Sequence, residues 1–521
     1  MKNDKLLTGA AWSWFIFGLS AAVATHIARS FAVFEINHFD GALRLLQSVY
    51  AAKRLIPYVD YGFVYPPGYA WLFGNLLGIE SVPVIISAES VLNFLLISIL
   101  TCLLMSISAN KRDRLLLGGL SFLFIGAFCS LPGPIFSPVL MGILSLLSLN
   151  AALHGPTPVR LALIALVAAA NFLMRWDWVI FNAVLLFLLA GSAFLFSRIY
   201  VQSTSAELKK ISICFLKIGV AEFLGILVAA AVFFVYAIFN GSLKAAYSFV
   251  FEIPLAILPY RQTPIPLPQG KNAQWLWNLI AIGAIAACGW IAASRDPKNK
   301  IFNLMICLLL LIPCFALIPY MFGRADFPHA FPLTILLVLA CSAAWAIWNG
   351  PYVKFGIPLL MLFLMEASAS LSYSHLKRFY TSRDDNWTGK EFAGSTKECI
   401  DLFPADARSL FVGQVSYRRY IINFPILYLM RSDLRPATTY LSDEPGLQNS
   451  CSYGAEIAAQ VRTAKRPLVF VRDTSPWPPE KNLTLSMTSC NKIEEAYESM
   501  KPQHIGFCRM YGRTLEISVA R

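Results

Sequence analysis

The feature that most limits how this chain can fold is the series of long apolar segments that fills about its first 374 residues. Lipid offers no hydrogen-bond partner to a free backbone, so a chain crosses a bilayer as a helix of about 20 mostly apolar residues. Such segments lie at about 7–32, 82–108, 115–131, 136–153, 158–174, 178–197, 211–239, 274–293, 301–320, 330–348 and 354–373. We therefore predict a polytopic α-helical membrane protein with about eleven transmembrane helices.

The composition indicates a membrane domain followed by a smaller water-soluble one. Hydrophobic residues make up 57% of the chain and charged residues 14%, whereas soluble domains carry about 25% charged residues. From about residue 375 the sequence reads like an ordinary soluble protein, with strand-like runs at 409–413, 467–473 and near the end, and helical patterns at 390–402, 454–464 and 491–500. This alternation predicts a small α/β domain over 375–521 after a membrane domain over 1–374.

The positions of Lys and Arg predict the orientation of the chain. Loops on the cytoplasmic side of a membrane carry an excess of both residues. Basic residues lie before the first helix and after the second, fourth, sixth and eighth, at Lys2, Lys5, Lys111, Arg112, Arg114, Arg160, Arg198, Lys209, Lys210, Arg295, Lys298 and Lys300. We therefore expect an integral inner or plasma membrane protein with a cytoplasmic N-terminus. The first loop (33–81), the loops 240–273 and 321–329, and the C-terminal domain then lie outside the cytoplasm, on the periplasmic or extracytoplasmic face.

Topology also explains the net charge of +13, so nucleic acid is not expected as a partner; no nucleic-acid-binding motif accompanies the charge. The apolar stretch that starts at Leu6 is too long for the core of a signal peptide. We interpret it as a retained first helix.

The first outer loop is too long to be a simple connection between helices. Its segment from Asp40 to Ala52 has helical spacing, which predicts an amphipathic helix in the membrane interface. Asp40 stands at the start of this helix, where aspartate commonly caps the free N–H groups. Asp60, in PYVDYGF, suits a turn. The pair Pro66-Pro67 then interrupts the chain.

Further charged residues lie in the other outer loops. The segment GRADFPHAFP places Arg324, Asp326 and His329 between two spans, where charges are costly and tend to be functional. An interfacial Arg–Asp pair that anchors the helix ends is the alternative.

Charged residues at two more outer positions suit either a structural role or ligand binding. Arg175 and Asp177, in MRWDW, are interpreted as an anchor with flanking tryptophans. Tyr260 and Arg261 lie in the loop 240–273, and the guanidinium offers a planar fork of donors to a phosphate. Arg261 could equally be a solvated loop charge.

A first helix, a long outer loop with an early acidic residue and the segment PYVDYGFVYPPGYAWL together resemble the GT-C superfamily of membrane glycosyltransferases. This superfamily includes protein O-mannosyltransferases and bacterial enzymes that add sugars, such as aminoarabinose, to lipid A or polysaccharide. The resemblance in architecture covers the whole chain, whereas the resemblance in sequence is confined to about residues 36–72. GRADFPHAFP also resembles a late outer loop of bacterial members.

The resemblance implies an inverting transfer from a polyprenyl-phosphate sugar donor to a lipid, glycan or protein acceptor, with membrane lipids as the surroundings. It places the essential acidic residue at Asp40. Many relatives carry an Asp-Glu pair there and this chain has Asp40-Gly41, so Asp60 is a rival and Glu35 a weaker one. Arg324 and Arg261 would stabilise the departing phosphate, with Asp326, His329, Tyr260 and Tyr65 as further substrate-binding candidates.

Two other functions remain open from the sequence: a transporter or flippase for lipid-linked saccharides, and a polymerase or ligase of such saccharides. No cofactor is expected, and a need for a divalent metal is left open. The cysteines Cys399, Cys451, Cys490 and Cys508 lie in the predicted outer domain, where one or two disulfides are expected. Their pairing is left open.

Overall fold

The computed structural model describes residues 2–31, 40–108, 110–128, 136–199, 202–256, 267, 273–296, 299–323, 327–348, 353–354, 356–366, 396–414, 425–441, 451–474, 492–510 and 513–521. The chain forms two compact units. The helical unit comprises Met1–Phe31, Ser87–Phe233 and Thr263–Arg378. The α/β unit comprises Ala32–Ile86, Phe234–Gln262 and Phe379–Arg521.

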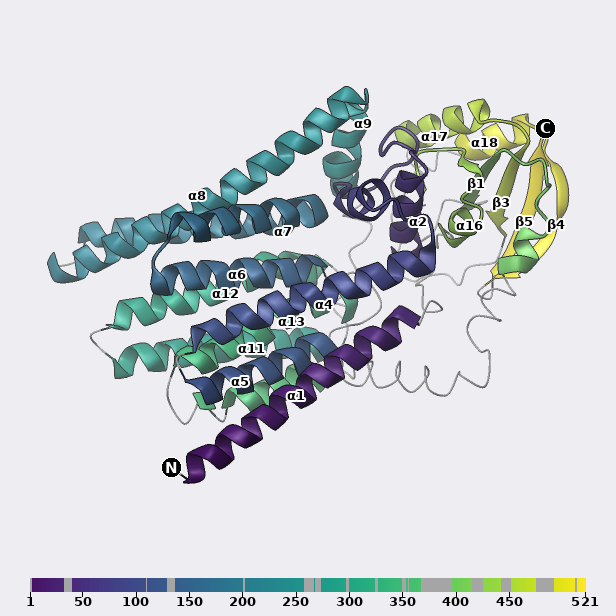
Figure 1. The fold of residues 1–521 in the computed structure, drawn as a ribbon. Coiled ribbons are helices and arrows are strands. Elements are labelled where there is room, and N and C mark those ends of the chain that lie inside the picture. Colours follow the sequence, from purple (N-terminus) through teal and green to yellow (C-terminus); the bar gives the residue numbers. More distant parts are fainter. Residues whose placement is uncertain are drawn as a thin grey trace. The chain divides into compact units, whose positions relative to one another are not determined.

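Long apolar helices make up the helical unit, and two of them, α4 and α8, continue into the α/β unit (Figure 1). Their bounds are α1 Lys2–Phe31, α4 Val82–Ile107, α5 Lys111–Ser121, η2 Phe122–Phe128, α6 Phe136–His154, α7 Pro158–Ile199, α8 Gln202–Phe239, α11 Gln274–Arg295, α12 Lys300–Gly323 and α13 Phe327–Ile347. Within the described residues, eight helices are long and apolar enough to cross a membrane. This finding agrees with a multi-pass helical membrane protein.

The eight helices and the eleven predicted spans differ at three places. The predicted fifth and sixth spans both lie in α7, which consists of two helices joined at a kink at Arg175 (φ −156°, ψ 83°). The predicted third span is helical over α5 and η2 but is not among the eight. The predicted last span is described as the short apolar helix Gly356–Glu366, and the rest of it lies outside the described residues. The number eleven therefore stays a prediction.

Burial within the helical unit separates central helices from peripheral ones. α6 packs against α7, α12 and α13. In its apolar stretch of 18 residues 72% of the residues are buried, and in the corresponding stretch of α13 the share is 78%. The apolar side chains of Leu166, Leu188 and Val228 are instead well exposed. Exposed apolar side chains on long helices are what a lipid-facing surface requires.

Small residues allow two helices of this unit to cross closely. A Cβ atom on Gly18 of α1 would collide with the backbone of Gly119 in α5. Glycine at such crossings lets helix backbones approach each other, as is common in membranes. The pair explains why α1, which has much exposed apolar surface, is held against α5.

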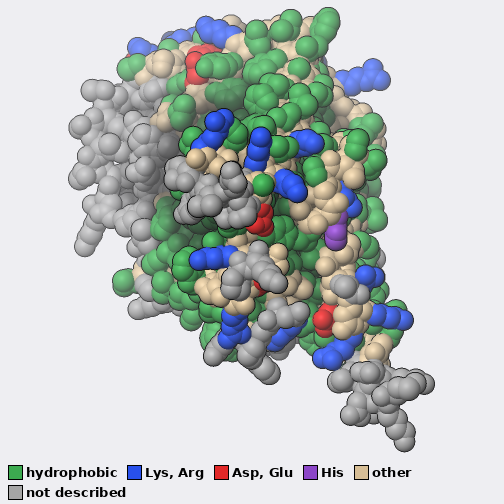
Figure 2. All heavy atoms as spheres, turned by 90° about the vertical axis from the view of Figure 1, so that its left-hand side faces the viewer, with side chains coloured by type: hydrophobic (Ala, Val, Ile, Leu, Met, Phe, Trp, Pro, Cys, Tyr) green, Lys and Arg blue, Asp and Glu red, His purple; other side chains and the backbone are tan. Residues whose placement is uncertain are grey.

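Basic residues gather at helix ends of the helical unit. Lys111 begins α5, Arg198 and Arg295 lie in the last turns of α7 and α11, and Lys300 begins α12. Figure 2, which faces the left-hand side of Figure 1, shows many Lys and Arg side chains and few acidic ones on that face. This is the distribution expected of loops that share one side of a membrane.

The α/β unit contains a five-stranded mixed sheet in the order β2-β1-β3-β5-β4. Its elements are β1 Ser409–Gln414, α16 Pro425–Met430, β2 Arg435–Pro436, α17 Cys451–Thr463, β3 Leu468–Asp473, α18 Lys492–Ser499, β4 Gln503–Met510 and β5 Arg513–Ala520. β1 is parallel to β2 and β3, whereas β5 is antiparallel to both β3 and β4. Strands occur at the three predicted runs, and helices at the predicted segments around α17 and α18.

Segments from the first loop belong to the same compact unit as this sheet. They form α2 Asp40–Ala52, α3 Gly68–Ala70 and η1 Trp71–Leu76, and the segment after α8 adds α9 Leu243–Tyr247 and η3 Ser248–Glu252. The N–H of Gly62 donates to the carbonyl of Thr439 over 2.6 Å. The ring of Phe249 lies 4.9 Å from that of Tyr440. Three stretches far apart in sequence thus share one core.

Disulfide bonds occur in the C-terminal part of this unit. Cys399 and Cys508 are bonded across a sequence separation of 109 residues, and Cys451 is also disulfide-bonded. The free cysteines within the described residues all lie in the helical unit, at Cys102, Cys214, Cys288, Cys307, Cys314 and Cys341. Disulfides persist in oxidising compartments, so their distribution is that expected of a C-terminal region outside the cytoplasm.

Candidate functional site

The predicted helix at the start of the first loop is confirmed as α2, which runs from Asp40 to Ala52. The side chain of Asp40, and all of Glu35, lie outside the described residues. Every residue of α2 from Leu45 to Ala51 is buried, including Gln47, so the helix is enclosed by protein instead of presenting a polar face to solvent. α16 and η1 pack around the helix, and its position in the membrane interface stays a prediction.

Asp60 closes the turn that follows α2. One of its carboxylate oxygens accepts a hydrogen bond from the N–H of Ile56 over 2.7 Å, and the Asp60 N–H donates back to the Ile56 carbonyl over 2.9 Å. Tyr58 adopts a positive φ of 67° inside this turn. The turn role predicted for Asp60 is therefore confirmed, and its second carboxylate oxygen has no hydrogen bond to a described residue.

Tyrosines fix the rest of the loop. The Tyr58 hydroxyl donates to the carbonyl of Tyr65 over 2.6 Å, and the Tyr61 hydroxyl donates to the carbonyl of Gln47 over 3.2 Å. Burial raises the pKa of both hydroxyls well above the ordinary value, so they stay protonated donors. The ring of Tyr65 packs edge-on against Phe63 at 5.3 Å. Tyr65 therefore has a structural role in this loop.

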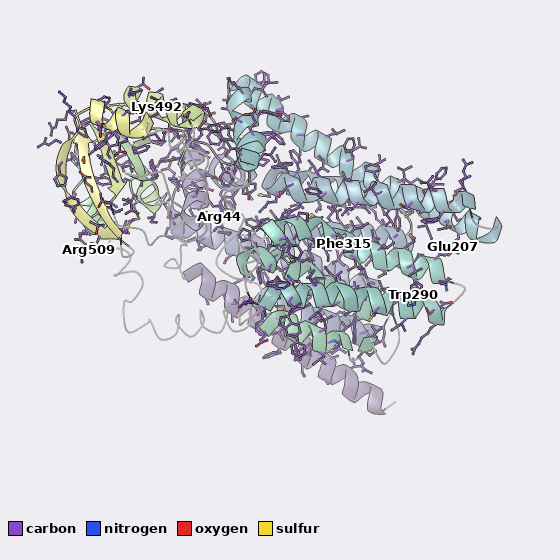
Figure 3. The ribbon with its side chains drawn as sticks, turned by 180° about the vertical axis from the view of Figure 1, so that it is seen from behind. Arg44, Glu207, Trp290, Phe315, Lys492 and Arg509 are labelled. Carbon is purple, nitrogen blue, oxygen red and sulfur yellow. A yellow bond between two sulfur atoms is a disulfide. The ribbon has the colours of Figure 1, made fainter. Side chains whose placement is uncertain are left out.

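A cation–π contact holds α2 against α3. The Arg44 guanidinium, labelled in Figure 3, lies 5.1 Å from the ring centroid of Tyr69. Such cation–π contacts contribute about 0.5–2 kcal/mol. The contact ties the helix that carries Asp40 to the segment that follows the Pro66-Pro67 break.

A pocket of about 300 Å³ lies beside Asp60, wholly within the α/β unit. Its wall combines residues of the Asp60 turn with the starts of β1 and β2, the segment 437–439 and the end of α17. The lining residues are Leu55, Val59, Asp60, Ser409, Arg435, Pro436, Ala437, Thr438, Thr439, Gln460, Thr463, Ala464 and Lys465. We call it the Asp60 pocket.

The back wall of the Asp60 pocket is held by one amide side chain. The carbonyl oxygen of Gln460 accepts hydrogen bonds from the Thr438 hydroxyl (2.8 Å) and from the Thr439 N–H (2.9 Å). The Thr438 hydroxyl also accepts from the N–H of Tyr440 over 3.2 Å. Gly62 binds the same segment from the first loop, as described above. The pocket is therefore a fixed feature whose shape depends on both the loop and the C-terminal region.

A separate polar cluster lies in the helical unit around Arg175. Its guanidinium forms two hydrogen bonds to the Asp177 carboxylate, of 2.9 and 3.2 Å. Its central carbon lies 4.5 Å from the ring centroid of Trp178 and 4.3 Å from that of Tyr320. The ring of His329 packs against the same Tyr320 ring in a tilted arrangement, with the centroids 4.9 Å apart. The structure thus joins the predicted Arg175–Asp177 pair to one member of the GRADFPHAFP segment.

The other predicted members of that segment, Arg324 and Asp326, lie outside the described residues, and so do Tyr260 and Arg261. Sequence reasoning treated Arg175 as an anchor and did not link it to His329. The two residues come from different helices, α7 and α13, and meet through Tyr320 at the end of α12. No local pattern could have revealed this contact.

Replacing Arg175 with lysine is expected to lower the free energy of unfolding by about 1–2 kcal/mol, because an ammonium group cannot form the paired hydrogen bonds or cover two rings at once. The measurement is the thermal unfolding midpoint in detergent. Arg198→Lys is the matched control, since Arg198 is an exposed residue of the same helix that contacts a single ring, Phe194. Equal shifts in the two variants would contradict the special role of the Arg175 cluster.

In the described part of the chain, no group of three or more His, Cys, Asp or Glu side chains is arranged to hold a metal ion. We searched for similar proteins, and no family model, curated protein or solved structure matches this chain.

Proposed function

We propose that this protein is a membrane glycosyltransferase that moves a sugar from a polyprenyl-phosphate donor to a lipid, glycan or protein acceptor at the outer face of the membrane. One observation supports this proposal above the others. The α/β unit collects segments 32–86, 234–262 and 379–521, which contain the first loop, most of the loop 240–273 and nearly all of the C-terminal region that loop charge assigns to the outer side. A loop bearing the candidate carboxylates and a soluble region are thus parts of one compact unit.

The chemistry assigns a role to each kind of residue. A carboxylate removes the proton from the acceptor hydroxyl while the oxygen of that hydroxyl forms a bond to the anomeric carbon of the sugar. The bond from that carbon to the phosphate oxygen breaks, and the phosphate leaves with its lipid. We assign the base to Asp40, with Asp60 as the rival. Cationic groups such as Arg324 and Arg261 stabilise the departing phosphate. The donor tail would lie among the apolar helices.

A second function, transport of a lipid-linked saccharide, is favoured by one feature of the helical unit. Glu222 of α8 is fully buried and accepts hydrogen bonds from the amide of Asn182 in α7 (2.9 Å) and from the hydroxyl of Ser148 in α6 (3.4 Å). Ionisable residues inside spans often mark a path for protons or substrates. The same three groups also suit a purely structural connection between helices.

The test is a transfer assay with purified protein and polyprenyl-phosphate sugars extracted from membranes. We expect the free polyprenyl phosphate and a glycosylated acceptor to form together. Movement of the intact lipid-linked sugar across reconstituted vesicles, with no release of polyprenyl phosphate, would instead establish transport. Glu222→Gln is the informative variant here: it is expected to leave transfer unaffected and to impair movement only if transport is the function.

A further inference from the structure

The Asp60 pocket has a size and a lining that select one class of ligand. Pockets for small molecules measure about 300–1,000 Å³, so a pocket of about 300 Å³ accommodates a single ring and not an isoprenoid chain. Its polar groups are hydroxyls, an amide, a carboxylate and two cations, whereas no aromatic side chain lines it. Small apolar side chains such as Val59 and Ala464 also line it. This mixture matches the alternating C–H and hydroxyl groups of a sugar ring.

The two cations of the pocket are uncommitted. Arg435 and Lys465 are both exposed, and neither side chain forms an ion pair or hydrogen bond with any described residue. They line the pocket from different elements: Arg435 lies in β2 and Lys465 lies just beyond α17. A ligand placed between them would satisfy both, since a guanidinium fork pairs with a carboxylate through two hydrogen bonds.

Charge balance narrows the ligand further. Two cations and the Asp60 carboxylate leave the wall with a net charge of one positive unit, which a single carboxylate neutralises. A phosphate monoester carries about −1.5 to −2 at neutral pH and would leave an excess of negative charge beside the Asp60 carboxylate. A neutral sugar would leave both cations unpaired. The balance therefore favours a sugar that carries one carboxylate.

We propose that the Asp60 pocket binds a uronic acid residue, with Arg435 and Lys465 pairing with its carboxylate and the Thr438–Thr439 segment and Asp60 facing its hydroxyls. Binding of the sugar is independent of catalysis. Only its role as part of the acceptor rests on the proposed function, which it would restrict to acidic glycans.

The pocket is also prepared before a ligand enters. Gln460 holds the hydroxyl of Thr438, and the Ile56 N–H holds one oxygen of Asp60, so little ordering is needed on binding. Preorganised groups retain more of their interaction energy as affinity. Because the first loop contributes part of the pocket wall, binding must be tested with the full-length protein.

The experiment measures equilibrium binding of glucuronate, glucose and glucose 6-phosphate to purified full-length protein in detergent. Binding is detected by saturation-transfer NMR and its affinity is measured by calorimetry. We expect glucuronate to bind about tenfold or more tightly than glucose, the difference that one charge-assisted contact produces, and also more tightly than glucose 6-phosphate. Arg435→Gln and Lys465→Gln are each expected to weaken glucuronate binding by about tenfold.

Arg462→Gln is the matched control, because Arg462 is exposed near the end of α17, three residues before Lys465, but does not line the pocket. Equal binding of glucose and glucuronate, or equal loss in all three variants, would overturn the proposal. Stronger binding of glucose 6-phosphate would replace the uronic acid with a phosphorylated sugar. Glucuronate binding by a protein without transferase activity would retain the pocket assignment and reject the proposed function.

Discussion

Asp40→Asn protein is expected to fold like the wild type and to transfer sugar at least about a hundredfold more slowly, since general-base catalysis contributes about 10²–10⁴-fold. Asparagine caps helices as well as aspartate does, so α2, which begins at Asp40, should be retained. The measurement is the initial rate of polyprenyl phosphate release at saturating donor. A melting midpoint equal to that of wild type would show that the loss is chemical.

Asp60→Asn is the comparison that separates the two candidates. The Ile56 N–H that donates to the Asp60 carboxylate can donate equally to an amide oxygen, so this variant keeps its turn while losing its charge. We expect its transfer rate to fall by less than about tenfold, because the charge acts in binding and not on the transferred proton. The reverse result, an inactive Asp60→Asn and an active Asp40→Asn protein, would move the base to Asp60. Two active variants would contradict both assignments.

The sequence predicts those parts of the fold that depend on local composition. Hydropathy over about 20 residues is a local property, and the helices that begin at Val82 and Gln274 therefore lie where apolar runs predict them. The strand at Leu468–Asp473 could also be predicted, because its side chains are nearly all buried and the segment is therefore a short apolar run. β4 was missed because its residues from Gln503 to Ile505 are exposed and a register shift lies between His504 and Gly506.

Contacts between distant segments could not be predicted in this way. Gln47 is buried because α16 and η1 pack around α2. The sequence of α2 itself does not indicate this burial. The Asp60 pocket depends on Gln460 holding Thr438, and on Gly62 bonding to Thr439, which are tertiary facts. Arg175 and His329 meet only because Tyr320 lies between them. Each candidate residue was visible by type, but the grouping into sites required the packed structure.

Removing the disulfide between Cys399 and Cys508 is expected to lower the free energy of unfolding by about 3–4 kcal/mol. The bond closes a loop with a sequence separation of 109 residues, and a cross-link over about 100 residues removes about 4.7 kcal/mol of unfolded-state entropy in the simplest treatment, with measured effects often smaller. It joins the segment before β1 to the edge strand β4. The Cys399→Ser/Cys508→Ser double variant should therefore unfold at a lower denaturant concentration.

Cys102→Ser is the matched control, since Cys102 is an exposed free cysteine of the helical unit; no change is expected there. Reduction alone cannot replace the double variant, because it would also open the disulfide of Cys451. The same bond reports the side of the membrane on which it forms. Protein taken from cells after thiols are blocked should contain oxidised Cys399 and Cys508, because an exported region meets an oxidising compartment. Reduced thiols at both positions would place the C-terminal region in the cytoplasm and remove the basis for a transfer reaction at the outer face.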